Sequence, residues 1–381
     1  MSTTFTERKP DRSGTLGVSP SLLRQRLSID CVGLEYKHCS SGLTFPVGIS
    51  SSGSYYPGQV IDNQFWTKLV DTNEEWIVAK TGIQTRRFLP EGQLCSDMCV
   101  RAARAALEND RLSSSDIDVI IVASITPDHR LPSMSLAIKE RLGAYRAVPI
   151  DLTQTACSSI IYATWLAARI LQDLSVTNVL VIGGDAMSRT INPEDRGSAV
   201  FFGDGAGALI MRRMRTEGLG FLSWSLGSQY SLDVSIMEGS AEARTEKSLA
   251  SAEHLFAMNG RSVWDSAMRV MPDSVRAAAL QADVDLDELD IVLLHQANLR
   301  LIEAIMDDLH LPMSRTLCNV ESFGNTCSAT LPTVIDQARK TGRLHHGSLV
   351  ALAGVGAGFM WGGAVLRHSQ DINDYEREEQ R

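Results

Sequence analysis

Apolar residues recur along the chain in two patterns, short continuous runs and longer stretches in which they lie three or four residues apart. Continuous runs occupy residues 119–124 (VIIVAS), 178–184 (NVLVIGG) and 291–296 (IVLLHQ), and such runs are typical of strands buried on both faces of a sheet. The stretch 161–173 (IYATWLAARILQD) has the spacing of a helix with a buried face. Strands and helices that alternate in this way predict an α/β fold.

A long internal similarity divides the chain into two related parts. Residues 104–124 (RAALENDRLSSSDIDVIIVAS) align with residues 276–296 (RAAALQADVDLDELDIVLLHQ) at a constant offset of 172. Each copy has the pattern of a helix, an acidic turn and an apolar strand. Similarity at a fixed period indicates duplicated structural units, so we expect two α/β halves.

The same comparison sets the expected boundaries of these halves. The stretches 323–339 (FGNTCSATLPTVIDQAR) and 348–354 (SLVALAG) follow the second copy in the order in which the segment around Cys157 and NVLVIGG follow the first. We therefore predict an N-terminal half over residues 46–215 and a C-terminal half over 216–370. Residues 1–45 lack sustained periodicity and are predicted to be a mobile extension, and residues 371–381 a charged tail.

Composition and charge exclude several classes of function. The chain has 381 residues, 44% of them hydrophobic, and a net charge of -9, which argues against nucleic acid or an anionic membrane as the main partner. No apolar stretch reaches the roughly 18 residues of a membrane span, and no signal-peptide segment is present. We therefore expect a cytoplasmic globular protein.

The seven cysteines do not form a disulfide or zinc pattern. Their number is odd, and Cys95 and Cys99 are followed by no second ligand pair. This usage fits a reducing compartment and predicts no metal site. The glycine-rich stretches GDGAGA and GVGAGF lack the strand, helix and acidic residue of a dinucleotide-binding motif.

One cysteine stands in a distinctive setting. Cys157 lies in TQTACSSI (153–160), among small and hydroxyl-bearing residues directly before the predicted helix 161–173. A thiol at a helix N-terminus is pushed toward thiolate, the nucleophilic form, and small neighbours leave room for an acyl group. The alternative interpretation is a buried cysteine that acts as a small hydrophobic residue.

Two residues of the second half are expected to lie near Cys157. His295 directly follows the strand IVLL, and Asn325 lies in SFGNTCSA, which is equivalent to the Cys157 segment. The carboxyl ends of strands in α/β sheets usually hold the ligand, and packing of two similar halves would bring these ends together. Taken singly, the histidine is also compatible with a structural role and the asparagine with a turn.

The motifs that carry this chemistry resemble those of the β-ketoacyl-ACP synthase III family, within the thiolase-like superfamily. The resemblance covers about residues 46–368 and rests on ACSS, HQANLR, FGNT, GVGAGFMWG, TNEEWIVAKTGIQTRR, NPEDRGSAVFFGDGAGA and FAMNGRSVW. It implies a thiolase-like five-layered αβαβα fold, usually a homodimer, without a permanently bound cofactor. It also implies a catalytic triad of Cys157, His295 and Asn325.

The resemblance implies a reaction in two stages. Cys157 accepts an acyl group from acyl-CoA, and decarboxylative Claisen condensation then joins this group to a malonyl thioester carried by acyl carrier protein or coenzyme A. Covalent transfer divides one difficult step into two easier ones. The backbone N–H groups of Cys157 and Ala357 are the implied oxyanion donors, where glycines let the backbone approach the substrate.

The resemblance also implies binding positions around this triad. They are Trp76, Lys80, Arg196, Asn259, Gly260 and Asn298 for coenzyme A, Leu131 and Phe359 for the acyl pocket, and Arg300, Asp265, Asp307 and Asp308 for carrier docking. An indole and a guanidinium plane both stack well on a purine.

The chain departs from the family at the carrier positions. Asp265, Asp307 and Asp308 stand where basic residues are usual, and together they would repel an acidic carrier. We therefore expect a specialised paralogue, as in secondary metabolism, that uses a different carrier or a coenzyme A thioester.

Two other functions compete with condensation. An acyltransferase would pass the acyl group of Cys157 to an alcohol or amine, and a non-catalytic subunit would only shape the acyl tunnel of a partner. Asn325 disfavours the first, because simple transfer needs no second donor to a malonyl carbonyl. A complete triad disfavours the second.

Overall fold

The structure, a computed structural model, describes residues 42–153, 155–237, 252 and 254–375. The predicted extension 1–45 lies outside these residues except for its last four. The N–H groups of Thr44 and Phe45 both donate to the Gln172 side-chain oxygen at 2.9 Å. The packed chain therefore extends to these two residues, so the predicted boundary is slightly late.

The predicted C-terminal tail is likewise partly packed. Its residues 371–375 include a short 3₁₀ helix, Ile372–Asp374. The Tyr375 ring is buried, and its hydroxyl donates to the Ile49 carbonyl at 2.8 Å. Residues 376–381 lie outside the described residues.

The first half is built on a five-stranded sheet. Its strands lie in the order β1 (Val47–Tyr55), β7 (Asp204–Arg213), β6 (Asn178–Ala186), β4 (Val119–Ala123) and β5 (Val148–Leu152). Strand β4 is parallel to β5 and β6, whereas β7 is antiparallel to β6 and β1. Every residue of β4, β6 and β7 is buried, as the continuous apolar runs predict.

The second half repeats this arrangement with one strand fewer. Its sheet has the order β11 (Ile291–Leu294), β12 (Leu349–Gly356), β13 (Met360–Arg367) and β8 (Gly220–Ser228). Strand β11 is parallel to β12, and the other pairs are antiparallel. Both predicted halves lie within one compact unit.

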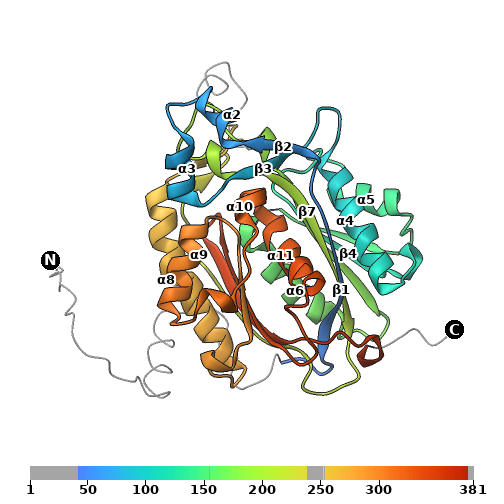
Figure 1. The fold of residues 1–381 in the computed structure, drawn as a ribbon. Coiled ribbons are helices and arrows are strands. Elements are labelled where there is room, and N and C mark those ends of the chain that lie inside the picture. The colour runs from blue at the N-terminus through green and yellow to red at the C-terminus, as the bar shows by residue number, and fades with distance from the viewer. Residues whose placement is uncertain (1–41, 154, 238–251, 253, 376–381) are drawn as a thin grey trace, which may run out of the picture. The chain divides into compact units, whose positions relative to one another are not determined.

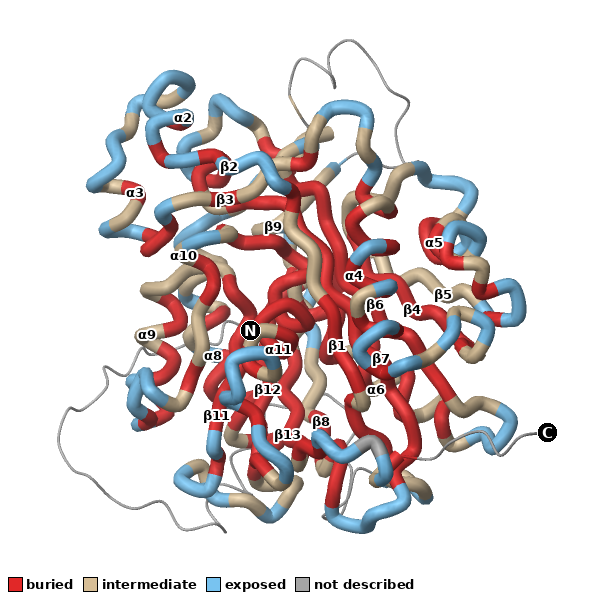
Figure 2. The backbone as a smooth tube through the Cα atoms, turned by 45° about the vertical axis from the view of Figure 1, so that its right-hand side comes forward, coloured by how far each residue is buried: buried red, intermediate tan, exposed pale blue. Residues whose placement is uncertain are grey.

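Helices cover both sheets and fill the space between them. Helices α6 (Ser159–Ile170) and α11 (Thr330–Lys340) contact strands of both sheets and share one apolar core with them. In Figure 2 these central segments and the strands are mostly buried. The middle layer of the fold is therefore a pair of helices, one from each half.

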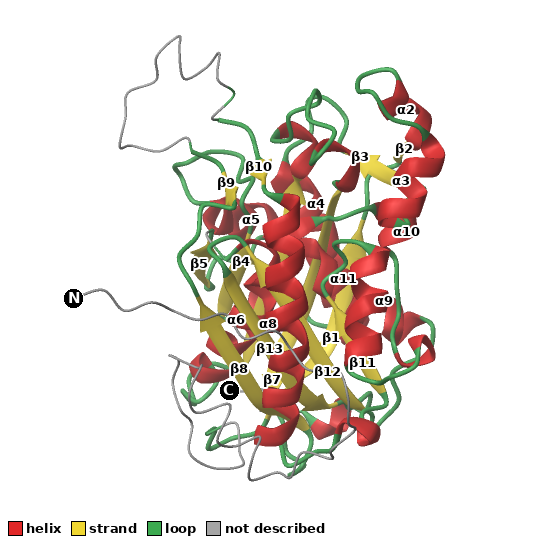
Figure 3. Cartoon of the chain, turned by 90° about the vertical axis from the view of Figure 1, so that its left-hand side faces the viewer, coloured by secondary structure: helices red, strands yellow, loops and turns green. Residues whose placement is uncertain are grey.

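The outer layers complete the architecture. Helices α4 (Cys95–Asp110) and α5 (Met134–Leu142) cover the first sheet, and α8 (Gly260–Gln281) covers the second beside α9 (Leu299–Asp308). Figures 1 and 3 show these helices outside the strands. The order helix, sheet, helix, sheet, helix is the predicted αβαβα fold.

The duplication extends to single turns. The 3₁₀ turns η2 (Ala156–Ser158) and η7 (Cys327–Ala329) precede α6 and α11 at an offset of 171 residues, and they contact each other. Ala156 has φ 41° and Cys327 has φ 50°, so equivalent positions share the left-handed conformation that is rare for residues with a side chain. The two turns are therefore related in conformation as well as in order.

Shorter elements surround the sheets. They are β2 (Gln59–Asp62), α2 (Asn63–Thr67), α3 (Glu74–Thr81), β3 (Thr85–Phe88), β9 (Val234–Ser235), β10 (Ala257–Met258) and α10 (Val320–Phe323). Asn73 caps α3 by accepting from the Trp76 N–H at 2.7 Å. Within the part of the chain that the structure describes, no helix is long and apolar enough to span a membrane.

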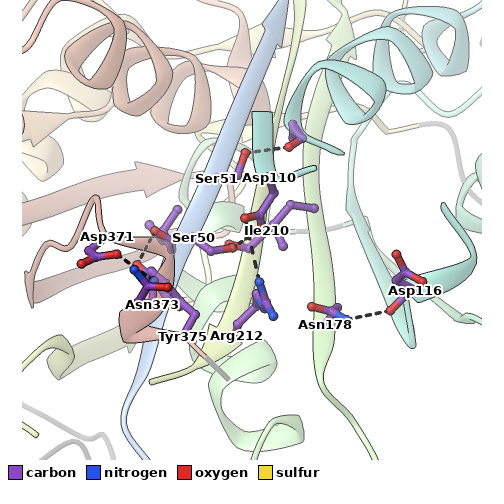
Figure 4. A network of polar contacts seen from close by, with 12 residues as sticks. Ser50, Ser51, Asp110, Asp116, Asn178, Ile210, Arg212, Asp371, Asn373 and Tyr375 are labelled. Atoms are coloured by element: carbon purple, nitrogen blue, oxygen red, sulfur yellow. Dashed lines mark hydrogen bonds and ion pairs between the residues drawn. The ribbon is translucent and has the colours of Figure 1, made fainter. Parts of the chain in front are cut away.

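Buried polar contacts hold β1 against its neighbours (Figure 4). The Ser51 hydroxyl donates to the Ala106 carbonyl of α4 at 2.6 Å, and the Ser50 hydroxyl donates to the Asp110 carboxylate. Arg212 of β7 lies 3.9 Å from that carboxylate, and both side chains are almost fully buried. This buried ion pair ties β7 to α4, because a shift of either element would leave each charge without its partner, and β1 joins it only through the Ser50 hydroxyl.

Candidate active site

A cavity of about 580 Å³ lies at the carboxyl ends of β11 and β12. Cys157, His295 and Asn325 all line it, although they come from three separate segments of the chain. The structure therefore brings together the three residues of the predicted triad.

Cys157 is positioned by the turn η2. It is the middle residue of this turn, directly before α6, as its sequence setting predicts. The left-handed Ala156 turns the chain just before it, and the Cys157 side chain is half-buried. Its sulfur faces the cavity at the positive end of a helix dipole.

His295 follows β11 and is nearly buried. Its Nδ1 atom lies 2.6 Å from the Thr330 hydroxyl, and this hydroxyl also lies 3.0 Å from the Cys327 carbonyl, to which it donates. A hydroxyl has one proton, so Thr330 accepts from Nδ1–H while it donates to the carbonyl. The Nε2 atom is left for the hydrogen bond to Cys157.

Asn325 is fixed by its own backbone and that of the next turn. Its N–H donates to the Phe201 carbonyl at 2.8 Å, and its side-chain oxygen accepts from the Cys327 N–H at 2.9 Å. With the oxygen held in this way, the side-chain NH₂ group is the end of the amide available to a ligand in the cavity.

The Cys157 thiol is strongly acidified. The neighbouring Cys327 thiol, which lies 3.5 Å away between sulfurs, lowers the pKa of Cys157 by donating to its thiolate. The positive charge of His295 and a hydrogen bond from its ring lower that pKa further, against the opposing effect of burial. The pKa of Cys327 is raised by the same contact, so Cys157 is the thiolate and Cys327 the thiol.

The end of β12 passes very close to the nucleophile. A Cβ atom added at Gly356 would lie 2.5 Å from the Thr155 carbonyl oxygen and 2.8 Å from the Cys157 nitrogen. Only glycine fits there, as the GVGAG motif predicts. The next residue, Ala357, lines the cavity, so its N–H and that of Cys157 belong to adjacent backbone segments suited to one oxyanion.

The predicted coenzyme A positions gather at the cavity mouth. Trp76, Lys80, Gly260 and Asn298 line it, and Asn259 caps α8 by accepting from the Ser262 N–H. These residues come from α3 and from the first turns of α8 and α9.

Trp76 and Arg196 stack on each other. The Arg196 guanidinium carbon lies 4.8 Å from the centre of the Trp76 ring. A base held between the two planes needs about 7 Å. The two planes therefore leave no room for a base between them in this structure.

Of the two residues predicted for the acyl pocket, only one lines the cavity. Phe359 lines the cavity. Leu131 is 85% exposed in the loop before α5 and is not among the lining residues, so this chain does not place it in its own acyl pocket. Sequence reasoning did not single out four aromatic lining residues, although all of them lie in the motifs NPEDRGSAVFFGDGAGA and FAMNGRSVW, namely Phe201, Phe202, Phe256 and Trp264.

The predicted acidic rim is wrong in two respects. Asp265 lies at the mouth, but Arg261 pairs with it at 3.0 Å. Asp307 lies seven residues beyond Arg300 on α9, about 10 Å along the helix axis, so it is remote from the mouth.

Asp308 is the third predicted rim residue. It pairs with Arg276 near the far end of α8 at 2.7 Å. Arg300 itself lines the cavity and pairs with Glu303 at 2.8 Å. Sequence spacing alone did not show which end of α9 faces the mouth.

Basic residues instead border the mouth. Arg261 and Arg269 of α8 line a shallow groove together with Asn259 and Asp265. Sequence reasoning missed these two arginines, although their spacing places them on one face of the helix.

Comparison with known proteins gives a consistent family. Residues 150–229 match the family described as 3-oxoacyl-(acyl-carrier-protein) synthase III, and residues 280–368 match the family of its C-terminal part. The chain is 36% identical over 327 residues to the beta-ketoacyl-(acyl-carrier-protein) synthase III of Desulfitobacterium hafniense strain Y51. This alignment covers 85% of this chain and 98% of that protein.

Solved structures agree with this comparison. The beta-ketoacyl-(acyl-carrier-protein) synthase III of Thermus thermophilus has a TM-score of 0.79 at 33% identity, with 85% of this chain and 100% of that chain covered. The priming β-ketosynthase of the R1128 polyketide pathway has a TM-score of 0.78 at 28% identity, with 88% and 98% covered.

The acidified thiol predicts an unusual pH profile of alkylation. Because the pKa of Cys157 is lowered, its thiolate persists below neutral pH, and the iodoacetamide rate at Cys157 should change less than about threefold between pH 8.5 and 6.5. An ordinary thiol loses about 50-fold over this range. Peptide mass spectrometry of timed samples measures the rate at this residue alone.

Variants separate the causes of this acidity. In His295→Ala the pKa of Cys157 should rise, so alkylation at pH 6.5 falls while alkylation at pH 8.5 largely remains. His345→Ala, which changes an exposed histidine, serves as the control and should keep the flat profile. An ordinary thiol profile in the unaltered protein would contradict the assigned thiolate.

Proposed function

The chain belongs to the β-ketoacyl-ACP synthase III family, and on this premise we propose that it loads an acyl group from acyl-CoA onto Cys157 and condenses it with a malonyl thioester. The product is a 3-ketoacyl thioester. The observation that carries the proposal is the cavity in which the Cys157 thiolate, His295 Nε2 and the Asn325 NH₂ group converge.

Loading begins with the thiolate. The Cys157 sulfur attacks the thioester carbonyl, the carbonyl oxygen becomes an oxyanion, and the N–H groups of Cys157 and Ala357 donate to it. Collapse of this intermediate breaks the bond to the coenzyme A sulfur, which leaves as a thiolate and takes a proton from water. His295 keeps its proton, held at Nδ1 by Thr330.

Condensation uses the two remaining donors. His295 Nε2–H and the Asn325 NH₂ donate to the thioester carbonyl of the malonyl group, so the enolate formed by loss of carbon dioxide is stabilised. The enolate carbon attacks the acyl carbon on Cys157. The bond to sulfur breaks, and the thiolate returns beside the imidazolium.

This donor pair favours condensation over simple acyl transfer. Transfer to an alcohol or amine needs a base at the acceptor, whereas Asn325 supplies a second hydrogen-bond donor and no base. The orientation of its amide by the Cys327 N–H keeps that donor in place. A non-catalytic role would leave the acidified thiolate without a purpose.

The cavity mouth supports binding of both thioesters. Lys80 lines it and Arg269 lies in the adjacent groove, whereas Arg300 and Arg261 at the same sites are paired with Glu303 and Asp265. Cations attract the phosphates of coenzyme A and an acidic carrier alike. Arg261 neutralises the charge of Asp265, so the expected repulsion of an acidic carrier at this site is not retained. We propose instead that an acidic acyl carrier protein docks on this groove.

The structural similarity to a polyketide priming synthase supports a starter role. That protein acts, by its description, at the priming step of a polyketide pathway. We propose that this enzyme likewise makes the first condensation of a chain, from a coenzyme A primer.

A second copy of the chain is the proposed partner along β5. This strand is the edge of its sheet, and Val148 at its start is 57% exposed. Leu136 and Tyr145 are also exposed in the segment that leads to it. An apolar edge of this kind pairs readily with a symmetry-related edge, which supports a homodimer.

The triad variants should divide the two stages. Asn325→Ala should accept an acyl group on Cys157 nearly as the unaltered enzyme does but lose condensation by about 10² to 10³. Asn325→Asp should behave like Asn325→Ala. The aspartate keeps an oxygen that accepts from the Cys327 N–H but lacks the NH₂ donor. His295→Ala should lose condensation by a similar factor and should load Cys157 more slowly near pH 6.5 than near pH 8.5, because His295 also acidifies the thiol.

One assay reads both stages. The enzyme is incubated with a short acyl-CoA alone, and peptide mass spectrometry measures the adduct on Cys157. It is then given malonyl thioester, and carbon dioxide and 3-ketoacyl product are measured. Transfer without carbon dioxide, or equal loss of both stages in Asn325→Ala, would overturn the proposed division of roles.

The docking groove can be tested by charge reversal. Arg269→Glu should raise the KM for a malonyl acyl carrier protein about 3- to 10-fold at low ionic strength, and salt should reduce the difference. The KM for malonyl-CoA should change less, because this exposed arginine faces the groove and does not line the cavity. Arg104→Glu, on the remote helix α4, is the matched control; an equal effect there would contradict the site.

The proposed dimer is testable in solution. Light scattering after size exclusion should give twice the chain mass for the unaltered protein, and Val148→Asp should shift it toward the monomer because a charge would be buried at the edge. Leu174→Asp, at a site that is 64% exposed on a loop, should leave the mass unchanged. A monomeric unaltered protein would contradict the proposal.

A further inference from the structure

The second cysteine of the cavity forms no bond to a substrate in the proposed condensation. Cys327 lies beside the nucleophile, with 3.5 Å between the two sulfurs. It begins η7, the turn that is equivalent to the η2 turn of Cys157, and the two turns pack against each other. The duplicated architecture thus places a thiol on each side of one contact.

The two sulfurs differ in reactivity, but both belong to residues that line the cavity. Cys157 is the thiolate and Cys327 its hydrogen-bond donor, so one is a nucleophile and the other holds a proton. Both line the cavity, although Cys327 is only 1% exposed. A small oxidant that enters the substrate cavity meets the thiolate first, and a second thiol lies within reach of the product.

We propose that Cys327 is a resolving thiol: a hydroperoxide oxidises Cys157, and Cys327 then closes a Cys157–Cys327 disulfide that holds the nucleophile inactive until a dithiol reduces it. This modification site is independent of the proposed condensation. It requires the sulfurs to approach from 3.5 Å to about 2 Å.

The steps balance with one hydroperoxide. The Cys157 thiolate attacks a peroxide oxygen, an S–O bond forms, the O–O bond breaks, and the leaving oxygen is protonated to water or to an alcohol. The Cys327 sulfur then attacks the sulfenic sulfur, an S–S bond forms, and the S–O bond breaks. The released hydroxide takes the Cys327 proton and leaves as water, so two thiols are oxidised and one peroxide is reduced.

The other cysteines in the described part of the chain provide an internal contrast. Cys95 and Cys99 form a second close pair on α4, but both are buried away from the cavity, and their contact together with burial raises the pKa of Cys99. Burial also raises the pKa of Cys318 to about 12. Oxidation follows thiolate character and access, so these thiols should react slowly.

The resting protein with hydrogen peroxide as the probe gives the decisive experiment, because no substrate is needed. After treatment with a small excess of peroxide, a non-reducing digest should contain the Cys157 and Cys327 peptides joined together, with the loss of two hydrogens. Iodoacetamide should no longer label Cys157, and dithiothreitol should restore most of the labelling. A failed condensation assay would leave this result unaffected.

Variants test the resolving role. In Cys327→Ala and Cys327→Ser, Cys157 should gain two or three oxygens and dithiothreitol should restore little labelling, whereas Cys99→Ala should still form the disulfide. Circular dichroism checks that each variant is folded. If both Cys327 variants fail to fold, the cross-link in the unaltered protein still tests the proposed disulfide. Over-oxidation of Cys157 without a cross-link, or a cross-link to any other cysteine, would overturn the proposal.

Discussion

The close approach of β12 to the η2 turn is the contact on which the active site depends. At Gly356 the two backbones pass so closely that no Cβ fits between them. This contact joins the last strand pair of the second half to the nucleophile of the first half. It sets Ala357 beside Cys157, and with it the relative position of the two amides that are proposed as oxyanion donors.

A buried carboxylate also stabilises the segments next to this contact. Asp185, at the end of β6, accepts from the N–H groups of Ile125 and Thr126 with one oxygen and from the Ser328 N–H with the other. It therefore ties the loop after β4 to the η7 turn of the other half. Its negative charge opposes ionisation of Cys157, so the positive His295 and the Cys327 thiol are needed to keep the thiolate.

Charge around the site is arranged by helix ends. The first turns of α3, α8 and α9 meet at the mouth and carry Trp76, Asn259 and Asn298 there, while the acidic end of α9 points away. Helices α8 and α9, which cover the second sheet, therefore also place side-chain amides and arginines at the cavity and its adjoining groove. The direction of these helices therefore determines both how the second sheet is covered and which polar groups surround the cavity mouth.

The sequence by itself determined the fold class and the duplication, and it named in advance three residues that the structure brings together in one cavity. Periodicity is a local property, so the buried strands, the turn before α6 and the repeated order of elements are read directly from it, and the glycine motif already implied close backbone contact. Side-chain pairing across the two halves depends on distances that no local pattern contains. Only the tertiary structure decided that Cys327 lies beside Cys157, that Thr330 holds His295, that Arg196 closes on Trp76, and that Asp308 pairs with Arg276 away from the mouth. Leu131 shows the same limit, because its apolar character did not reveal that one chain leaves it outside its own cavity.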